Sequence, residues 1–300
     1  MLDHRPSFTA AFVAACRGLG PMLPPHARLI DDPLGLRFAG PWLTPLARTV
    51  LSARGPLRLA AQAALLPMLP WVVYMQVRTR AIDDALRAFV AEGGAQVVIL
   101  GAGFDARAVR LADGLRGVRV IEVDHPATQQ RKAAELAAAG VTSDATYLAW
   151  DFERDDLAAL PSRLAALGHD PARPTFTVWE GVTMYLSTDA LAATVAAIAA
   201  YSAPASQLAF NYVRRDLVDR PGFAAGAVAL VVRAVGEPFR SGFDPATLPA
   251  WLSVRGFRLL RDDDFAALAA RLLPPAWSRS VRRGRRLILV ERTAVSERVG

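Results

Sequence analysis

Residues Ala95–Asp105 read AQVVILGAGFD, and this segment is the most informative about the fold class. Val97–Leu100 is a short apolar run rich in β-branched residues, which is typical of a fully buried parallel strand. Gly101 and Gly103 follow it, and without Cβ atoms they let the backbone turn sharply and approach a bound group. Ala106–Leu111 can begin a helix, so the turn joins a strand to a helix. The spacing matches the loose dinucleotide-binding pattern, with a ligand-free glycine turn as the alternative.

Polar residues also follow three later β-rich runs, which are Val118–Val123, Thr146–Trp150 and Thr175–Trp179. After the first run, the carboxylate of Asp124 can accept hydrogen bonds from both hydroxyls of a ribose. After the second, Asp151 can accept from an adenine amino group while the ring of Phe152 packs on the base. The third run leads into Glu180. These residues predict a nucleoside site at the carboxyl edge of a parallel sheet.

Both NAD and S-adenosylmethionine carry such a ribose, so the first two strands alone leave an NAD(P)-dependent oxidoreductase open. Lys132 is the only lysine, so the chain has no Tyr-x-x-x-Lys pair for short-chain reductase chemistry. Asp151 and Glu180, after two further strands, fit a methyl donor better. A non-catalytic module that keeps a nucleotide pocket is the alternative of another class.

Four motifs occur in a fixed order, namely RTRAID at Arg78–Asp83, LGAGFDAR at Leu100–Arg107, EVDHP at Glu122–Pro126 and EGVTMYL at Glu180–Leu186. Together they resemble the bacterial branch of the leucine carboxyl methyltransferase-like family of class I S-adenosylmethionine-dependent methyltransferases. The resemblance covers about residues 6–290. It implies a single α/β Rossmann-like domain, with a seven-stranded, mostly parallel sheet, helices on both faces and an N-terminal helical extension.

The same resemblance implies the division of the chain. Residues 1–80 are expected to form the helical extension that covers the active site, and residues 81–300 the methyltransferase domain. A substrate-capping insertion is expected around residues 213–245, where Phe223–Val232 is apolar. We expect a helix over Ala81–Glu92, with Arg78 and Arg80 just before it. Leu287–Val290 is expected to be an antiparallel strand at or near the sheet edge.

The resemblance also implies site roles. The expected catalytic residues are Arg78, Glu180 and Tyr185, and the expected cofactor-binding residues are Arg78, Gly101, Gly103, Asp105, Asp124, Asp151, Phe152 and Glu180. Arg78 matches the arginine that grips the methionine carboxylate with its planar fork, and a surface ion pair with Asp83 or Asp84 is the alternative. For Glu180 the alternative is a buried structural carboxylate. Arg17 matches an arginine of the family's extension, with a structural or solvated arginine as the alternative.

The composition of the chain bears on which other kinds of site or partner are expected. Hydrophobic residues make up 53% of 300 residues, enough for a large core, and the formal net charge is +7. Cys16 is the only cysteine and the four histidines are scattered, so we expect neither an internal disulfide nor a metal site. The basic cluster Arg282–Arg286 lacks a clear aromatic stacking platform, which disfavours nucleic-acid binding. Pro67 and Pro70 interrupt the uncharged stretch Leu59–Val77, which favours a buried helix pair or an apolar cover over a membrane span.

The predicted activity is O-methylation by S-adenosylmethionine. The expected acceptor is a carboxylate of a hydrophobic small molecule or peptide end, because a carboxylate needs no base at neutral pH. The alternative is a hydroxyl of a polyketide-like natural product, and either acceptor suits secondary metabolism. With no secretory signal visible at the start, we expect a cytoplasmic enzyme. The identity of the acceptor and the oligomeric state are left open.

Overall fold

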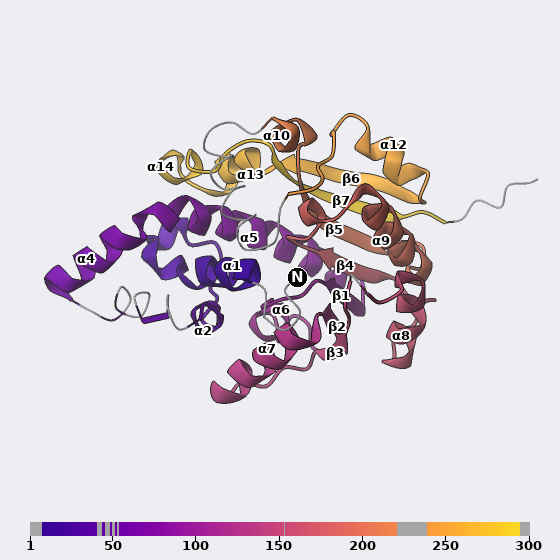
Figure 1. Cartoon of the computed structure of the whole chain (residues 1–300), viewed down its shortest axis with the longest axis horizontal. Helices are drawn as coiled ribbons and strands as arrows, with labels where there is room; N and C mark the ends of the chain where they lie inside the picture. The colour runs from indigo at the N-terminus through magenta and orange to yellow at the C-terminus, as the bar shows by residue number, and fades with distance from the viewer. Residues whose placement is uncertain are drawn as a thin grey trace, which may run out of the picture.

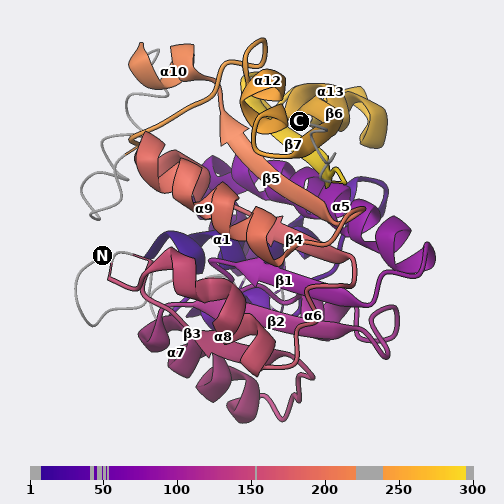
Figure 2. The ribbon, with the colours of Figure 1, turned by 90° about the vertical axis from the view of Figure 1, so that its right-hand side faces the viewer.

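The computed structural model describes residues 8–40, 44, 45, 49, 52, 54–152, 154–220 and 239–294. A seven-stranded sheet runs through its centre in the order β3-β2-β1-β4-β5-β7-β6 (Figure 1, Figure 2). The strands are β1 Gln96–Leu100, β2 Arg119–Asp124, β3 Thr146–Ala149, β4 Thr175–Trp179, β5 Gln207–Val213, β6 Phe257–Asp264 and β7 Arg285–Arg292. β1 to β5 pair in parallel, and β7 pairs antiparallel with both β5 and β6. The mostly parallel α/β class and the antiparallel strand near the edge are therefore confirmed.

Helices cover both faces of this sheet. After β1 they are α6 Arg107–Arg110, α7 Pro126–Ala138, α8 Leu160–Ala166, α9 Thr188–Tyr201, α10 Arg215–Asp219, α12 Leu248–Ser253, α13 Phe265–Leu272 and α14 Pro275–Ser278, with 3-10 turns η4 Leu157–Ala159 and η5 Thr183–Tyr185. Successive side chains of a strand point to opposite faces. In β1, Val97 and Ile99 join the core formed with α5 and α13, while Val98 and Leu100 join the core formed with α8 and α9. This two-sided burial is why Val97–Leu100 is apolar throughout.

The N-terminal part is helical, as expected. It comprises α1 Phe8–Gly18, η1 Gly20–Met22, η2 Pro25–Ala27, α2 Gly35–Phe38, α4 Gly55–Leu65, η3 Leu66–Met68 and α5 Leu69–Ala91. α1 packs against both α2 and α5. Gly18 and Gly35 allow the close approach of α1 and α2, because a Cβ on Gly35 would lie 2.3 Å from the carbonyl oxygen of Ala14.

The expected start of a helix at Ala81 is wrong. α5 begins at Leu69 and passes through Arg78 and Arg80 without a break. Pro70 stands in its first turn, where the missing N–H of proline costs nothing because those N–H groups have no intrahelical partner. Continuous burial of Val72, Val73 and Val77 against the core then favours one long helix.

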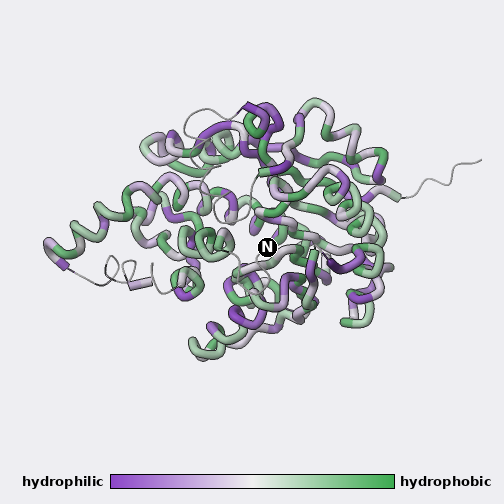
Figure 3. The backbone as a smooth tube through the Cα atoms, viewed as in Figure 1, coloured by the Kyte–Doolittle hydropathy of each residue, from purple (hydrophilic) through white to green (hydrophobic). Residues whose placement is uncertain are grey.

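The apolar stretch Leu59–Val77 forms two helical segments joined at η3. By length and composition alone, Gly55–Ala91 would suffice to cross a membrane, and 29% of its most apolar window is buried within the protein. α4 extends away from the sheet in Figure 1 and is coloured mostly as hydrophobic in Figure 3. Leu57 and Leu59 on it are exposed. The apolar run Phe223–Val232 lies outside the described residues, so the central part of the expected insertion has no structural account.

Candidate active site

A cavity of about 470 Å³ opens at the carboxyl ends of the parallel strands. It lies where the strand order turns from β1 toward β2 on one side and toward β4 on the other, which is the usual ligand position in an open α/β sheet. All nine residues predicted for the site line this cavity: Arg78, Gly101, Gly103, Asp105, Asp124, Asp151, Phe152, Glu180 and Tyr185. The structure thus brings the predicted residues together, while their individual roles stay predictions.

The loop after β1 is shaped by its glycines. Gly101 has a φ of 64° and Gly103 a φ of 53°, which L side chains rarely adopt. A Cβ on Gly101 would lie 2.6 Å from Cγ2 of Val182, and one on Gly103 would lie 3.1 Å from Cβ of Ala10. The loop therefore packs closely against both the turn after β4 and helix α1, and any larger residue at Gly101 would push into the cavity wall.

Asp124 at the end of β2 holds the same loop in place. Its two carboxylate oxygens accept hydrogen bonds from the backbone N–H groups of Gly103 at 2.5 Å and His125 at 2.7 Å. Burial raises the pKa of the Asp124 carboxyl, and these two hydrogen bonds oppose that rise. Glu122, two residues earlier, is fully buried and paired with Lys132. The carboxylate that lines the cavity is thus Asp124, as predicted, and Glu122 is structural.

Glu180, directly after β4, lies between two arginines. Its Oε1 is 2.5 Å from Nε of Arg78, its Oε2 is 2.7 Å from Nη1 of Arg107, and its side chain is only 8% exposed. Burial alone would raise the pKa of Glu180, but the charges of Arg107 and Arg78 outweigh burial and hold this pKa far below its usual range. Glu180 is therefore held in its ionised form between the two arginines, and its lowered pKa makes it a weak proton acceptor.

Arg78 and Arg80 have different surroundings, although one residue separates them on α5. Arg78 is buried and directed to Glu180, whereas Arg80 forms a partly exposed ion pair with Asp84. The surface ion pair considered for Arg78 is thus formed by Arg80 instead. Because successive residues in a helix point about 100° apart, residues two positions apart cannot face the same cavity.

Sequence reasoning did not assign Arg107 to the site, and it left the role of Arg17 open. Arg107 is 2% exposed and contacts Asp83 at 2.8 Å as well as Asp105 and Glu180, so it organises the buried charges beneath the loop. Arg17 lines the cavity, pairs with Asp32 at 2.8 Å and donates to the carbonyl oxygen of Phe104 at 2.5 Å. For Arg107, the available signal was its place in the motif LGAGFDAR, two residues after Asp105.

The two ends of the cavity differ in character. At one end Asp151 and Phe152 adjoin His125, whose Nε2 is 3.9 Å from a carboxylate oxygen of Asp151. At the other end Tyr185 stacks on Phe239 with ring centroids 5.7 Å apart, and Arg240 lines the wall. The first end suits a base and ribose, and the second suits an acceptor with an apolar part.

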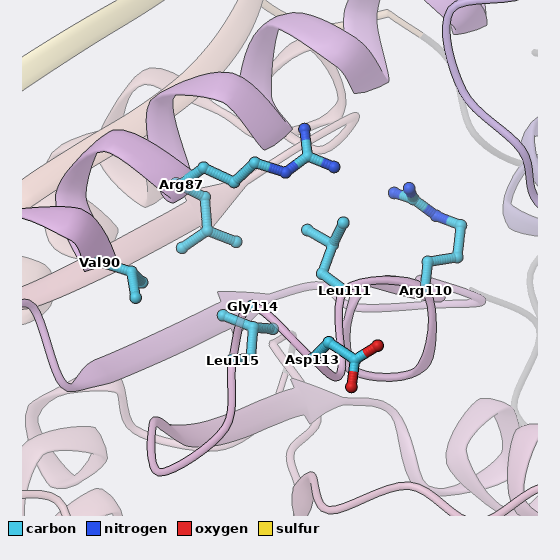
Figure 4. A pocket seen from close by; sticks show the side chains of 8 residues that line it. Arg87, Val90, Arg110, Leu111, Asp113, Gly114 and Leu115 are labelled. Atoms are coloured by element: carbon cyan, nitrogen blue, oxygen red, sulfur yellow. The ribbon is translucent and has the colours of Figure 1, made fainter.

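Two further observations bear on what the protein can bind. Among the residues that the structure describes, no group of three His, Cys, Asp or Glu side chains is placed to hold a metal ion. A smaller cavity of about 160 Å³ lies between α5 and the turn after α6, where Arg87 and Arg110 extend toward one another above Leu111 (Figure 4). None of the predicted site residues lines it, so the larger cavity is the candidate active site.

Comparisons with known proteins agree with this assignment. The model of the leucine carboxyl methyltransferase family matches residues 10–199. A provisionally assigned S-adenosyl-L-methionine-dependent methyltransferase of Streptomyces coelicolor is 41% identical over 154 residues, which are 51% of this chain and 52% of that protein. A Frankia alni protein of the same assignment is 35% identical over 208 residues, 67% of this chain and 68% of its own. The match thus spans about half to two thirds of these relatives.

The fold also has a solved counterpart. A DUF574 family protein from Streptomyces avermitilis superposes with a TM-score of 0.60 at 15% identity, covering 98% of this chain and 100% of that one. At that level of identity the likeness shows the fold alone. The family model, by contrast, spans the loop after β1 and the turn after β4, both of which line the cavity.

Proposed function

The chain belongs to the leucine carboxyl methyltransferase family, and from this premise we propose that it transfers a methyl group from S-adenosylmethionine to an oxygen atom of an apolar acceptor, a carboxylate oxygen by first preference. The relatives named above are assigned to the same cofactor, and S-adenosylmethionine is the cofactor of this protein. NAD(P) chemistry, which the first two strands left open, has no support among these relatives.

The residues present fit that cofactor. A cavity of about 470 Å³ has room for a nucleoside with an amino-acid tail, and its wall includes a glycine loop into which a Cβ on Gly101 would not fit. We propose that Asp124 holds the ribose hydroxyls and that Asp151 and Phe152 hold the adenine. Arg78 is proposed to bind the methionine carboxylate, beside the backbone of Gly101 and Gly103.

The choice between a carboxylate and an alcohol acceptor depends on whether the site offers a base, and Glu180 is the carboxylate to consider. An alcohol must lose its proton during transfer, and a positioned base would contribute about 10²–10⁴-fold to the rate. Arg78 and Arg107 keep Glu180 ionised and occupied, and His125 is the one histidine among the described residues lining the cavity, at its ribose end. A carboxylic acid is already ionised at neutral pH. An acceptor that arrives as an anion therefore suits this site better than an alcohol.

When bound, the cofactor supplies an electrophilic methyl group on a positively charged sulfur. The work left to the protein is alignment and the exclusion of water, because an acceptor carboxylate becomes a neutral ester without a proton transfer. Tyr185, stacked on Phe239, and the adjacent apolar residue Leu186 line the acceptor end. Glu180 contributes by fixing Arg78 in the orientation that its fork requires.

The chemical test uses the methyl label. The enzyme is incubated with host metabolite extract and labelled S-adenosylmethionine, and products that gain one methyl group are isolated by mass spectrometry. Mild alkali releases methanol from a methyl ester, whereas a methyl ether keeps its label. Volatile label supports the carboxylate, and retained label would overturn it in favour of a hydroxyl, such as one on a polyketide-like product. Binding of S-adenosylmethionine without any turnover would indicate a non-catalytic module.

We propose that residues 1–80 cover the active site and that residues around 213–245 cap the acceptor. We further propose a cytoplasmic location and an acceptor from secondary metabolism. The acceptor is proposed to be a hydrophobic small molecule or peptide end, with no role for nucleic acid.

A further inference from the structure

Arg240 differs from the other arginines that line the large cavity. The other two, Arg17 and Arg78, are buried and are each paired with a carboxylate at 2.8 Å or less. Arg240 is exposed, and within the described part of the chain no carboxylate forms an ion pair with it. It is thus a cation on the cavity wall whose charge the described residues leave available to a ligand.

The backbone at Arg240 is held firmly at the acceptor end. Its N–H donates to the carbonyl oxygen of Met184 at 2.8 Å, and the hydroxyl of Ser241 donates to the carbonyl oxygen of Thr183 at 2.8 Å. Phe239, on its other side, stacks on Tyr185. The segment Phe239–Ser241 is therefore attached to η5, the turn that follows Glu180 and β4. This attachment positions the guanidinium next to the apolar wall rather than leaving it on a free loop.

We infer that Arg240 is the residue that recognises the charge of the acceptor, by binding a carboxylate whose apolar part lies along Tyr185 and Leu186. This inference rests on the proposed function and names its acceptor class as an apolar monocarboxylate. A guanidinium binds carboxylates through charge-assisted hydrogen bonds. Because methylation converts the carboxylate into a neutral ester, the same contact favours the substrate over the product and so aids product release.

The test compares octanoate with its methyl ester, which differ by the charge that Arg240 would bind. Protein saturated with S-adenosylhomocysteine is titrated calorimetrically with each compound. We expect wild type to bind octanoate more tightly than the ester, and Arg240→Gln to lose about tenfold or more in octanoate affinity while its ester affinity is unchanged. Arg240→Lys should recover part of the difference. Arg214→Gln is the matched control, since Arg214 is a nearby exposed arginine that pairs with Asp216 and does not line the cavity.

Equal octanoate affinity in wild type and Arg240→Gln would overturn the inference, as would equal losses for acid and ester, or no binding of octanoate to wild type. A turnover assay with octanoate separates this inference from the proposed function. Arg240-dependent binding without formation of methyl octanoate would count against carboxylate methylation and leave the recognition by Arg240 standing. Ester formation with the same KM in Arg240→Gln would support the function and reject the role of Arg240.

Discussion

Nη1 of Arg107 lies 2.7 Å from Oε2 of Glu180, and this buried ion pair joins the helix after β1 to the turn after β4. The two elements lie on either side of the point where the strand order reverses, between β1 and β4. The ion pair therefore fixes the two walls of the cavity relative to each other. Asp83 on α5 also contacts Arg107, at 2.8 Å. Three segments that are distant in the sequence are thus held by one guanidinium.

Glu180→Gln is expected to destabilise the protein by about 3–5 kcal/mol, because it leaves two buried arginines without their shared counter-charge. Urea unfolding at pH 7 measures the change. The control is Asp113→Asn, which removes an exposed ion pair with Arg116 and should leave the unfolding midpoint unchanged. A midpoint for Glu180→Gln equal to that of wild type would show that the buried pairing contributes nothing to stability.

The same residue predicts a pH dependence. The pKa of Glu180 is lower in the folded protein than in the unfolded chain, where it is about 4.3. Its contribution to stability is therefore complete above about pH 4.3 and is lost as the pH falls from there toward the folded pKa. We expect the difference in unfolding free energy between wild type and Glu180→Gln to shrink over that acidic range and to stay constant from pH 6 to 8. A constant difference down to pH 3 would contradict the low pKa.

Gly101→Ala tests the close packing of the loop. Its positive φ alone costs an alanine about 1–2 kcal/mol, and the new Cβ would also clash with Val182. Gly117→Ala is the control for the φ cost, since Gly117 has a φ of 79° and nothing within 4 Å of an added Cβ. Gly101→Ala should be the more damaging of the two by unfolding free energy, and Val182→Ala should restore part of the loss. Equal effects at both glycines would rule out the clash.

The sequence predicted the positions of those site residues that directly follow parallel strands. Residues that follow parallel strands must lie at one edge of the sheet. Gly101, Asp124, Asp151 and Glu180 could therefore be assigned to one site from the sequence alone. The order of the strands then determines which loops are adjacent, and β1 between β2 and β4 made these four converge.

Other features depend on tertiary packing and were missed for that reason. The local sequence of Arg107 shows only one of its partners, Asp105, because Asp83 and Glu180 come from other segments. The start of α5 was misplaced at Ala81, just after Arg78 and Arg80, whereas burial of Val77 and Arg78 continues the helix through both arginines.

Arg78→Lys is expected to lower cofactor affinity and turnover although it keeps the charge. A lysine ammonium is a point charge that cannot bind Glu180 and a ligand carboxylate through a planar fork. Arg80→Lys is the matched control on the same helix, because Arg80 contacts only the partly exposed Asp84 among the described carboxylates. S-adenosylhomocysteine titration compares the two variants. If Arg78→Lys binds as tightly as wild type, the proposed contact with the methionine carboxylate is wrong.

Asp124 is expected to affect cofactor affinity more than stability. Its carboxylate accepts a hydrogen bond from the N–H of Gly103 and is proposed to accept hydrogen bonds from the ribose. Asp124→Ala removes these charged hydrogen bonds, each of which contributes about 1.5–3 kcal/mol, so the affinity for the cofactor should fall about tenfold or more. Asp124→Asn keeps one acceptor oxygen and should lose less. Glu122→Gln is the contrasting variant on the same strand, because Glu122 is buried against Lys132 and does not line the cavity. It should lower the unfolding free energy and leave the S-adenosylhomocysteine dissociation constant near that of wild type. Calorimetric titration at matched temperature, with unfolding measured in parallel, separates the two effects. An unchanged dissociation constant for Asp124→Ala would remove Asp124 from the ribose site.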